Sequence, residues 1–177
     1  MNKISLAGLI FLALFFSGCA TTAATKDIQI DTEADPKANF SGYKSYAWLG
    51  SAAIVYDTAG QWEPPQFDAD AEITFLIDRE LRKRGMSEDS VNPDMLVAYA
   101  AGIDMDTLRV EIDPESEIKT LKNVPQGALV IALVDAETSV AIWAGLATGE
   151  VQQDPDQETV KARLDYAVTQ MLKKLPR

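Results

Sequence analysis

The chain contains one cysteine, Cys19, and no histidine among its 177 residues. These two counts exclude much of side-chain catalysis. Without histidine there is no Ser-His-Asp or Cys-His relay, and one cysteine alone cannot complete a Cys/His zinc site. Carboxylates, Tyr, and Ser with Lys are the groups that remain. We therefore expect no catalytic residue, no metal site and no cofactor.

Cys19 has no partner for an internal disulfide, so it needs another role. It follows a leader in which Lys3 precedes an apolar run over residues 4–16 and then Ser17-Gly18. The run is too short to cross a bilayer comfortably and has the order of a signal peptide. Small residues directly before a cysteine resemble the bacterial lipobox, with Phe16 where Leu is usual. This resemblance implies cleavage before Cys19 and acylation of its sulfur; the alternative is an ordinary signal peptide with a chance cysteine.

The leader also predicts the organisation and location of the protein. We expect a signal peptide over residues 1–18, a lipidated tether over 19–27 and a single domain over 28–177. Ala20 resembles the residue found after the cysteine in lipoproteins that are sorted to the outer membrane. We therefore expect an anchor at the periplasmic face of the cell outer membrane, held by acyl chains on Cys19.

The charge balance restricts the partners. The chain has 16 Lys and Arg against 27 Asp and Glu, a net charge of −11. Binding to nucleic acid requires clustered bases, so we expect none. Anionic lipid headgroups would repel this surface, which leaves the acyl chains as the membrane contact. An envelope protein is the partner class that remains.

The abundant carboxylates offer two further kinds of site. Asp104, Asp106 and Glu111 begin an acidic segment over residues 104–127 that could ligate Ca²⁺ through oxygen. The spacing fits no EF-hand loop, so a solvated loop is the simpler interpretation. A strand over residues 108–112 is an alternative for part of it. A carboxylate pair for glycoside cleavage also stays open.

An aromatic and proline-rich segment offers a different kind of site. Residues 50–67 show no clean period and read as a long loop. It contains Tyr56, Trp62 and Phe67, which we take as candidate contacts for a partner, because aromatic side chains bring large apolar area at low entropic cost. The alternative is that this loop folds back over the sheet.

Periodicity predicts the elements that position these residues. Apolar or alternating strands are expected over residues 28–31, 43–49, 95–103, 128–134 and 140–146. A helix is expected over 69–84, capped by Asp68 or Asp70 and ended by Gly85. A last helix begins with Asp154 as its cap and Pro155 at its first position. It buries a stripe formed by Val160, Leu164, Val168, Met171 and Leu172.

These elements predict an α+β domain with two layers, a mainly antiparallel sheet with two helices packed on one face. Residues 128–134 and 140–146 are almost entirely apolar and are joined as a hairpin. Such runs indicate strands covered on both faces, or strands covered on one face and packed on a partner with the other.

Several segments in order resemble a bacterial lipoprotein family, that of domain of unknown function 4136. They are the aromatic strand at residues 40–48, the helix ending at 77–85, the strand at 93–99 and Trp143-Ala144-Gly145. Residues 104–127 depart from the family pattern. The resemblance implies a secreted lipoprotein domain without an assigned activity. We expect a non-enzymatic accessory or interaction module; the alternatives are a carrier of a lipid or other apolar ligand and a carboxylate-based envelope hydrolase.

Overall fold

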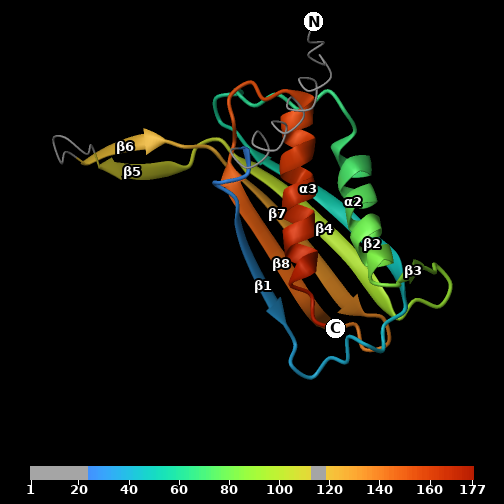
Figure 1. The fold of residues 1–177 in the computed structure, drawn as a ribbon. Coiled ribbons are helices and arrows are strands. Elements are labelled where there is room, and N and C mark those ends of the chain that lie inside the picture. Colours follow the sequence, from blue (N-terminus) through green and yellow to red (C-terminus); the bar gives the residue numbers. More distant parts are fainter. Residues whose placement is uncertain (1–23, 113–118) are drawn as a thin grey trace, which may run out of the picture.

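The computed structural model describes residues 24–112 and 119–177. Its main sheet has six strands in the order β1-β8-β7-β4-β2-β3. The strands of this sheet are β1 (Gln29–Ala34), β2 (Ser45–Tyr56), β3 (Ser87–Glu88), β4 (Met95–Asp104), β7 (Gln126–Asp135) and β8 (Ala141–Glu150). Helices α2 (Ala69–Lys83) and α3 (Gln157–Lys173) lie side by side on one side of this sheet (Figure 1). The fold is thus α+β.

The sheet is mixed, and the prediction of a mainly antiparallel sheet was wrong. β1, β8, β7 and β4 pair antiparallel, whereas β4 with β2 and β2 with β3 pair parallel. The cause is the connection through α2. Because this helix carries the chain back along the sheet after β2, β4 enters beside β2 in the same direction.

β2 extends further than the sequence indicated. Residues 50–56, which were predicted to lie in a loop, continue the strand and pair with β4 from Gly50↔Ala98 to Tyr56↔Asp104. The register shifts between Trp48 and Gly50, which interrupts the strand period at Leu49. The sequence signal was weak because the second half of β2 has no alternation.

The segment over residues 104–127 forms an arm. β5 (Leu108–Ile112) and β6 (Lys119–Asn123) pair antiparallel as a separate two-stranded sheet. Residues 113–118 at its tip lie outside the described residues. The arm leaves the main sheet where β4 ends and β7 begins, and it projects away from the helices and the sheet (Figure 1).

Capping residues define the helix ends. Asp68 caps α2 by accepting a hydrogen bond from the Ala71 amide at 2.9 Å, and Gly85 follows the helix at φ 82°. α3 begins two residues later than predicted. Its cap is Asp156, whose carboxylate accepts from the Thr159 amide at 2.6 Å. Pro155 therefore precedes the cap instead of opening the helix.

The core fills the space between the helices and the facing side of the sheet. Trp143, Tyr46, Leu76 and Ile131 are among its fully buried side chains. On α3 the buried residues are Ala167, Val168, Met171 and Leu172, while Leu164 is only partly buried. The predicted stripe is thus fully buried only in the C-terminal half of α3. Among the described residues, no helix is long and apolar enough to cross a membrane.

Candidate functional site

The two faces of the main sheet differ in burial, because side chains alternate along each strand. Val97, Ile131 and Leu133 point toward the helices and are fully buried. Their neighbours along β4 and β7 point the other way, because successive side chains alternate. No helix or second sheet of residues 24–112 and 119–177 covers that side (Figure 1). We call the residues of β2, β4, β7 and β8 on that side the open face.

The pairing registers place the residues of the open face in cross-strand rows. One row reads Leu146, Val130, Ala100 and Ala52 across β8, β7, β4 and β2. The row toward one end reads Ala144, Ala132, Ala98 and Gly50, and the row toward the other end reads Thr148, Ala128, Gly102 and Ile54. Thr148 is the only polar side chain in these rows, so the centre of the open face is apolar.

Several larger side chains on this side remain accessible to solvent. Val130 is 37% exposed, Leu146 36% and Ile54 64%. The alanines and glycines between them have small side chains, so the surface of this face stays close to the backbone. Soluble monomers rarely leave a contiguous apolar sheet face uncovered, and such surfaces commonly mark binding sites. The near-continuous apolar runs of β7 and β8 therefore correspond to the second option inferred from sequence, strands with one face covered internally and the other available to a partner.

The margin of the open face is acidic. None of the residues in the six strands of the main sheet is Lys or Arg. On the edge strand β1, Glu33 pairs with Ala144 and Asp31 with Leu146, so both carboxylates flank the apolar rows. Asp104 ends β4 on the same side and is exposed. The surface is thus apolar at its centre and negative along one edge and one end.

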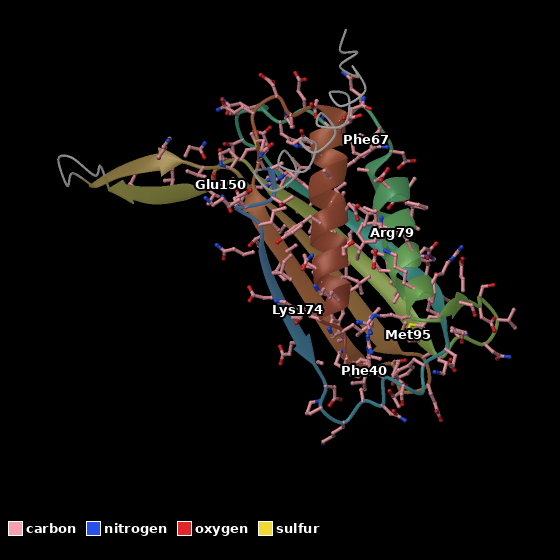
Figure 2. All side chains as sticks on the ribbon, viewed as in Figure 1. Phe40, Phe67, Arg79, Met95, Glu150 and Lys174 are labelled. Carbon is pink, nitrogen blue, oxygen red and sulfur yellow. The ribbon has the colours of Figure 1, made fainter. Side chains whose placement is uncertain are left out.

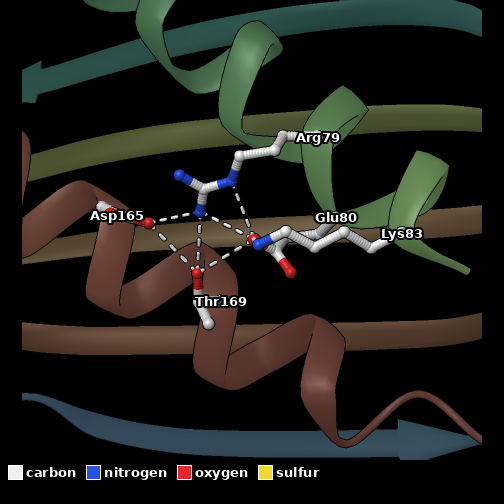
Figure 3. Close-up of polar contacts among 5 residues, drawn as sticks. All are labelled: Arg79, Glu80, Lys83, Asp165 and Thr169. Atoms are coloured by element: carbon white, nitrogen blue, oxygen red, sulfur yellow. Dashed lines mark hydrogen bonds and ion pairs between the residues drawn. The ribbon is translucent and has the colours of Figure 1, made fainter.

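A network of charged side chains ties the two helices together (Figure 3). Arg79 of α2 donates to Glu80 at 2.7 Å, to Thr169 at 2.9 Å and to Asp165 of α3. Lys83 also donates to Glu80, at 2.8 Å. The hydrogen bond from Arg79 lowers the pKa of Asp165. Burial opposes ionisation of Glu80, yet Lys83 and Arg79 lower its pKa. Both carboxyls are paired with bases and have lowered pKa values, which suits a strap between helices and not a proton donor.

Hydrogen-bonded Tyr–Asp pairs engage more carboxylates along the sheet. Tyr46 donates to Asp78 at 2.7 Å, and Tyr99 donates to Asp70. Burial, followed by the bonded carboxylate, raises the pKa of each of these two tyrosines to about 12. Among the described Asp and Glu residues, every carboxyl with a shifted pKa is shifted downward. A general acid in glycoside cleavage needs the opposite shift.

The start of the described chain is clamped to α3. Arg163 donates to both carboxylate oxygens of Asp27, each at 2.7 Å, and also to the carbonyl oxygen of Ala24. The hydrogen bonds from Arg163 lower the pKa of Asp27 to about 2. Residues 24–27, assigned from sequence to the tether, thus pack on the domain. Cys19 itself lies outside the described residues.

The predicted contact residues Tyr56, Trp62 and Phe67 have different local surroundings. Tyr56 ends β2, is 57% exposed and points to the side of the open face, as its pairing with Asp104 indicates. Phe67 lies near the start of α2, and the Lys161 Nζ of α3 is 5.0 Å from its ring centroid (Figure 2). Trp62 is partly buried in the connecting loop, where its amide donates to Asp57 at 2.7 Å. A partner contact at Trp62 stays a prediction.

Asp104 and Asp106 of the acidic segment have local hydrogen-bond partners. Asp104 accepts a hydrogen bond from the Asp106 amide at 2.9 Å, and Asp106 accepts from the Thr58 hydroxyl at 2.9 Å. Within residues 24–112 and 119–177, no three Asp, Glu, Cys or His residues are grouped closely enough to hold a metal ion. Asp106 thus joins the segment after β4 to the segment after β2.

The chain has recognisable relatives. The sequence model described as "Domain of unknown function (DUF4136)" matches residues 30–177. A search of the curated proteins found no match. A DUF4136 family protein from Bacteroides thetaiotaomicron is similar in structure, with a TM-score of 0.53 at 11% identity, over 81% of this chain and 95% of that one. A PDZ domain protein from Parabacteroides distasonis has a TM-score of 0.51 at 14% identity, over 89% of this chain and 39% of that one. This chain thus spans well under half of the second protein, and at such identities the likeness shows the fold alone.

Proposed function

We propose a function from the premise that this chain belongs to the DUF4136 family, whose description assigns no activity. The protein is a non-enzymatic interaction module of the bacterial envelope, anchored by lipid on Cys19 at the periplasmic face of the outer membrane. It holds its partner on the open face. The single observation that carries the proposal is that the apolar rows of β8, β7, β4 and β2 lie on the side of the sheet away from both helices.

The physical reason is the hydrophobic effect. Removing apolar surface from water stabilises a complex by roughly 25 cal/mol per Å². The sheet already buries one face under α2 and α3, so the domain folds without using the other. An apolar face that folding does not need can contribute to binding. The rigid strands also keep this surface preformed, which lowers the ordering cost of association.

The two alternatives have less support. A carrier would need room for an apolar ligand between sheet and helices, but that space holds Trp143, Tyr46 and Met171, each no more than 2% exposed. A carboxylate hydrolase would need an acid with a raised pKa. The carboxyls of the helix network and of the Tyr–Asp pairs that shift at all shift downward.

The anchor rests on the leader and on the clamp. The clamp holds Ala24 on the domain, and Cys19 precedes it by a stretch that reaches at most about 18 Å. The domain would therefore stay near the membrane at the end where Ala24 lies. Cys19→Ala should abolish incorporation of a radioactive fatty acid and normal processing of the leader. A variant that still labels and still sediments with membranes would refute the anchor.

The interaction proposal is tested by site-specific photocrosslinking in the envelope. A photoreactive amino acid at Leu146, at the centre of the open face, should capture a discrete partner. Phe75 is the matched control, because it is a large apolar residue that is 60% exposed on α2, away from the open face. Equal capture from both positions, or capture from neither, would refute the proposal.

A further inference from the structure

We propose that two copies of this chain pair along the free edge of β2 and join their main sheets into one. The inference is independent of the proposed function, because it uses an edge of the sheet and leaves the open face exposed. Its basis is the stretch over residues 50–56, a regular strand whose outer edge has no pairing partner in the part of the chain that the structure describes.

The outer edge of β2 is paired only at its start. β3 pairs with Ser45 and Tyr46, and among the described residues no strand pairs with that side of β2 further along. Every residue over 49–56 is exposed, although this stretch belongs to the main sheet. Ile54 points to the open side and Val55 to the helix side, yet they are 64% and 45% exposed. This end of β2 is therefore accessible on both faces as well as along its edge.

Alternate residues of this stretch direct their backbone hydrogen-bonding groups outward. The Tyr56 carbonyl oxygen accepts from the Met105 amide at 2.8 Å, so the backbone groups of Tyr56 point toward β4. This direction alternates along a strand, and the pairing with β4 has no shift after the bulge. The N–H and C=O groups of Ser51, Ala53 and Val55 therefore point away from β4. A row of such groups is a template for a further strand.

Two copies of residues 50–56 complement each other when they pair antiparallel about Ala53. Ala53 is the middle of the stretch and lies opposite its own copy on a two-fold axis. Each larger side chain then faces a small one of the other copy: Val55 faces Ser51, Ile54 faces Ala52, and Tyr56 faces Gly50. Cross-strand contacts of this kind stabilise a sheet, and an aromatic ring compensates for a glycine opposite it. The outward backbone groups are exchanged in the same register.

Charge permits self-pairing at this edge of an acidic chain. β2 contains no charged residue and no proline, the residues that usually protect a sheet edge. Self-pairing therefore brings no carboxylates of β2 together, despite a net charge of −11. The next residue, Asp57, accepts from an amide of its own loop at 2.7 Å. The opposite edge strand, β1, carries Asp31 and Glu33, so pairing it with its own copy would place carboxylates close together.

The other elements leave room for the pairing. Asp70, near the start of α2, accepts from the Ser51 hydroxyl at 2.8 Å. From there α2 runs toward the beginning of β2, where Tyr46 donates to Asp78 at 2.7 Å. The two α2 helices thus extend away from the two-fold axis in opposite directions. β3 lies beside Ser45 and Tyr46, short of the paired stretch.

The contact uses the same edge of both copies, so assembly stops at a dimer. Opposite residues of an antiparallel pair lie on the same face, so both open faces lie on one side of the joined sheet and both pairs of helices on the other. The dimer thus presents a doubled open face. Pairing of one strand is a small interface, and we expect a dissociation constant in the roughly micromolar range.

The first test measures the dimer by sedimentation of the full chain, purified from membranes in detergent. Ala53→Pro should raise the dissociation constant by about tenfold or more, because proline removes an outward N–H and leaves the pairing with β4 intact. Ala53→Lys should have the same effect, because like charges would lie opposite each other. Ala144→Lys is the matched control, since it adds the same charge at an exposed alanine of β8, away from this edge. It should leave the dimer unchanged.

The second test determines the register. Ala52→Cys in one chain and Ile54→Cys in another should give a crosslinked dimer when mixed, because these residues face each other. Ala52→Cys mixed with Val130→Cys, which lies on the open face, should not. The unmodified chain, with Cys19 alone, gives the background. Crosslinking of Val130→Cys chains mainly to each other would overturn the proposal in favour of paired open faces.

The outcomes separate this inference from the proposed function. A chain that stays monomeric up to about 1 mM, or a dimer that both Ala53 variants leave unchanged, would overturn the edge pairing. The interaction module stands in that case if Leu146 still captures an envelope protein. A dimer that both Ala53 variants weaken, together with no capture from Leu146, would support the edge pairing and refute the interaction module.

Discussion

Gly145 provides a sharp test of how the core was built. It lies on β8 two residues after Trp143, in the regular part of the β7–β8 pairing, so both residues face the helices. A Cβ added at Gly145 would lie 2.5 Å from the Trp143 ring and 3.1 Å from the Met171 sulfur. Carbon atoms in contact sit about 3.5–4.0 Å apart. The added methyl therefore overlaps the ring by about 1 Å.

The expected cost follows from the packing of the site. Trp143 is 2% exposed and Met171 is fully buried, so neither can move into solvent. Overpacking of such sites typically costs about 1–3 kcal/mol. Gly145→Ala should thus lower the unfolding midpoint by roughly 2–12 °C, since 1 kcal/mol is worth about 2–4 °C in a domain of this size.

Gly102→Ala is the matched control. Gly102 lies on the open face, where an added Cβ meets only the Ile54 carbonyl oxygen, at 3.9 Å. Alanine in a strand is favoured over glycine by about 0.5–1 kcal/mol, so this variant should be neutral or more stable. Urea unfolding followed by circular dichroism measures both. Trp143→Leu should relieve much of the Gly145→Ala penalty in a double-mutant cycle. Equal effects at the two glycines, or no relief, would refute the assignment of faces.

Three further outcomes are expected. Asp27→Asn should remove stability on the order of 2 kcal/mol above about pH 4. The folded pKa of Asp27 is about 2, below its ordinary value of 3.8, so this stability is lost as pH falls from about 4 toward 2. An acid-unfolding curve that is the same for Asp27→Asn and the unmodified chain would contradict the clamp. Leu172→Ala should lower the free energy of unfolding, measured in urea, by about 2–5 kcal/mol. Leu164→Ala should lower it clearly less, because Leu172 is 1% exposed and Leu164 is only partly buried. Equal losses would mean that α3 packs differently. Trp62→Ala should leave the unfolding midpoint nearly unchanged while weakening a crosslinked envelope complex; a large stability loss, with Trp62 shielded from a fluorescence quencher, would assign the loop to the core.

Local chemistry determined much of the secondary structure. Asp68 and Gly85 fix the two ends of α2 through interactions within a few residues. The spacing of the apolar residues between them determines which side of the helix is buried. The β7–β8 hairpin needs only the short polar turn between two apolar runs. The sequence also indicated that these runs would be covered on both faces, or covered on one face and packed on a partner with the other. That follows from composition, because apolar side chains on both faces need two covers.

Tertiary structure decided the rest. Nothing local distinguishes residues 50–56 from a loop, and they form a strand because β4 offers a partner edge. The parallel pairing of β2 with β4 depends on the route of the chain through α2. The cap of α3 moved to Asp156, and Leu164 became half-buried, because the placement of α3 on the sheet selects its first turn and its buried face.

By itself, then, the sequence determined the family, the two helices and most of the strands. Each of these features depends on residues that are close together along the chain. Only the tertiary structure decided that β2 pairs parallel with β4 over its whole length and that the β5–β6 arm stands away from the main sheet. The reason is physical: the direction in which two strands pair depends on the route of the chain between them, and no short pattern of residues records that route.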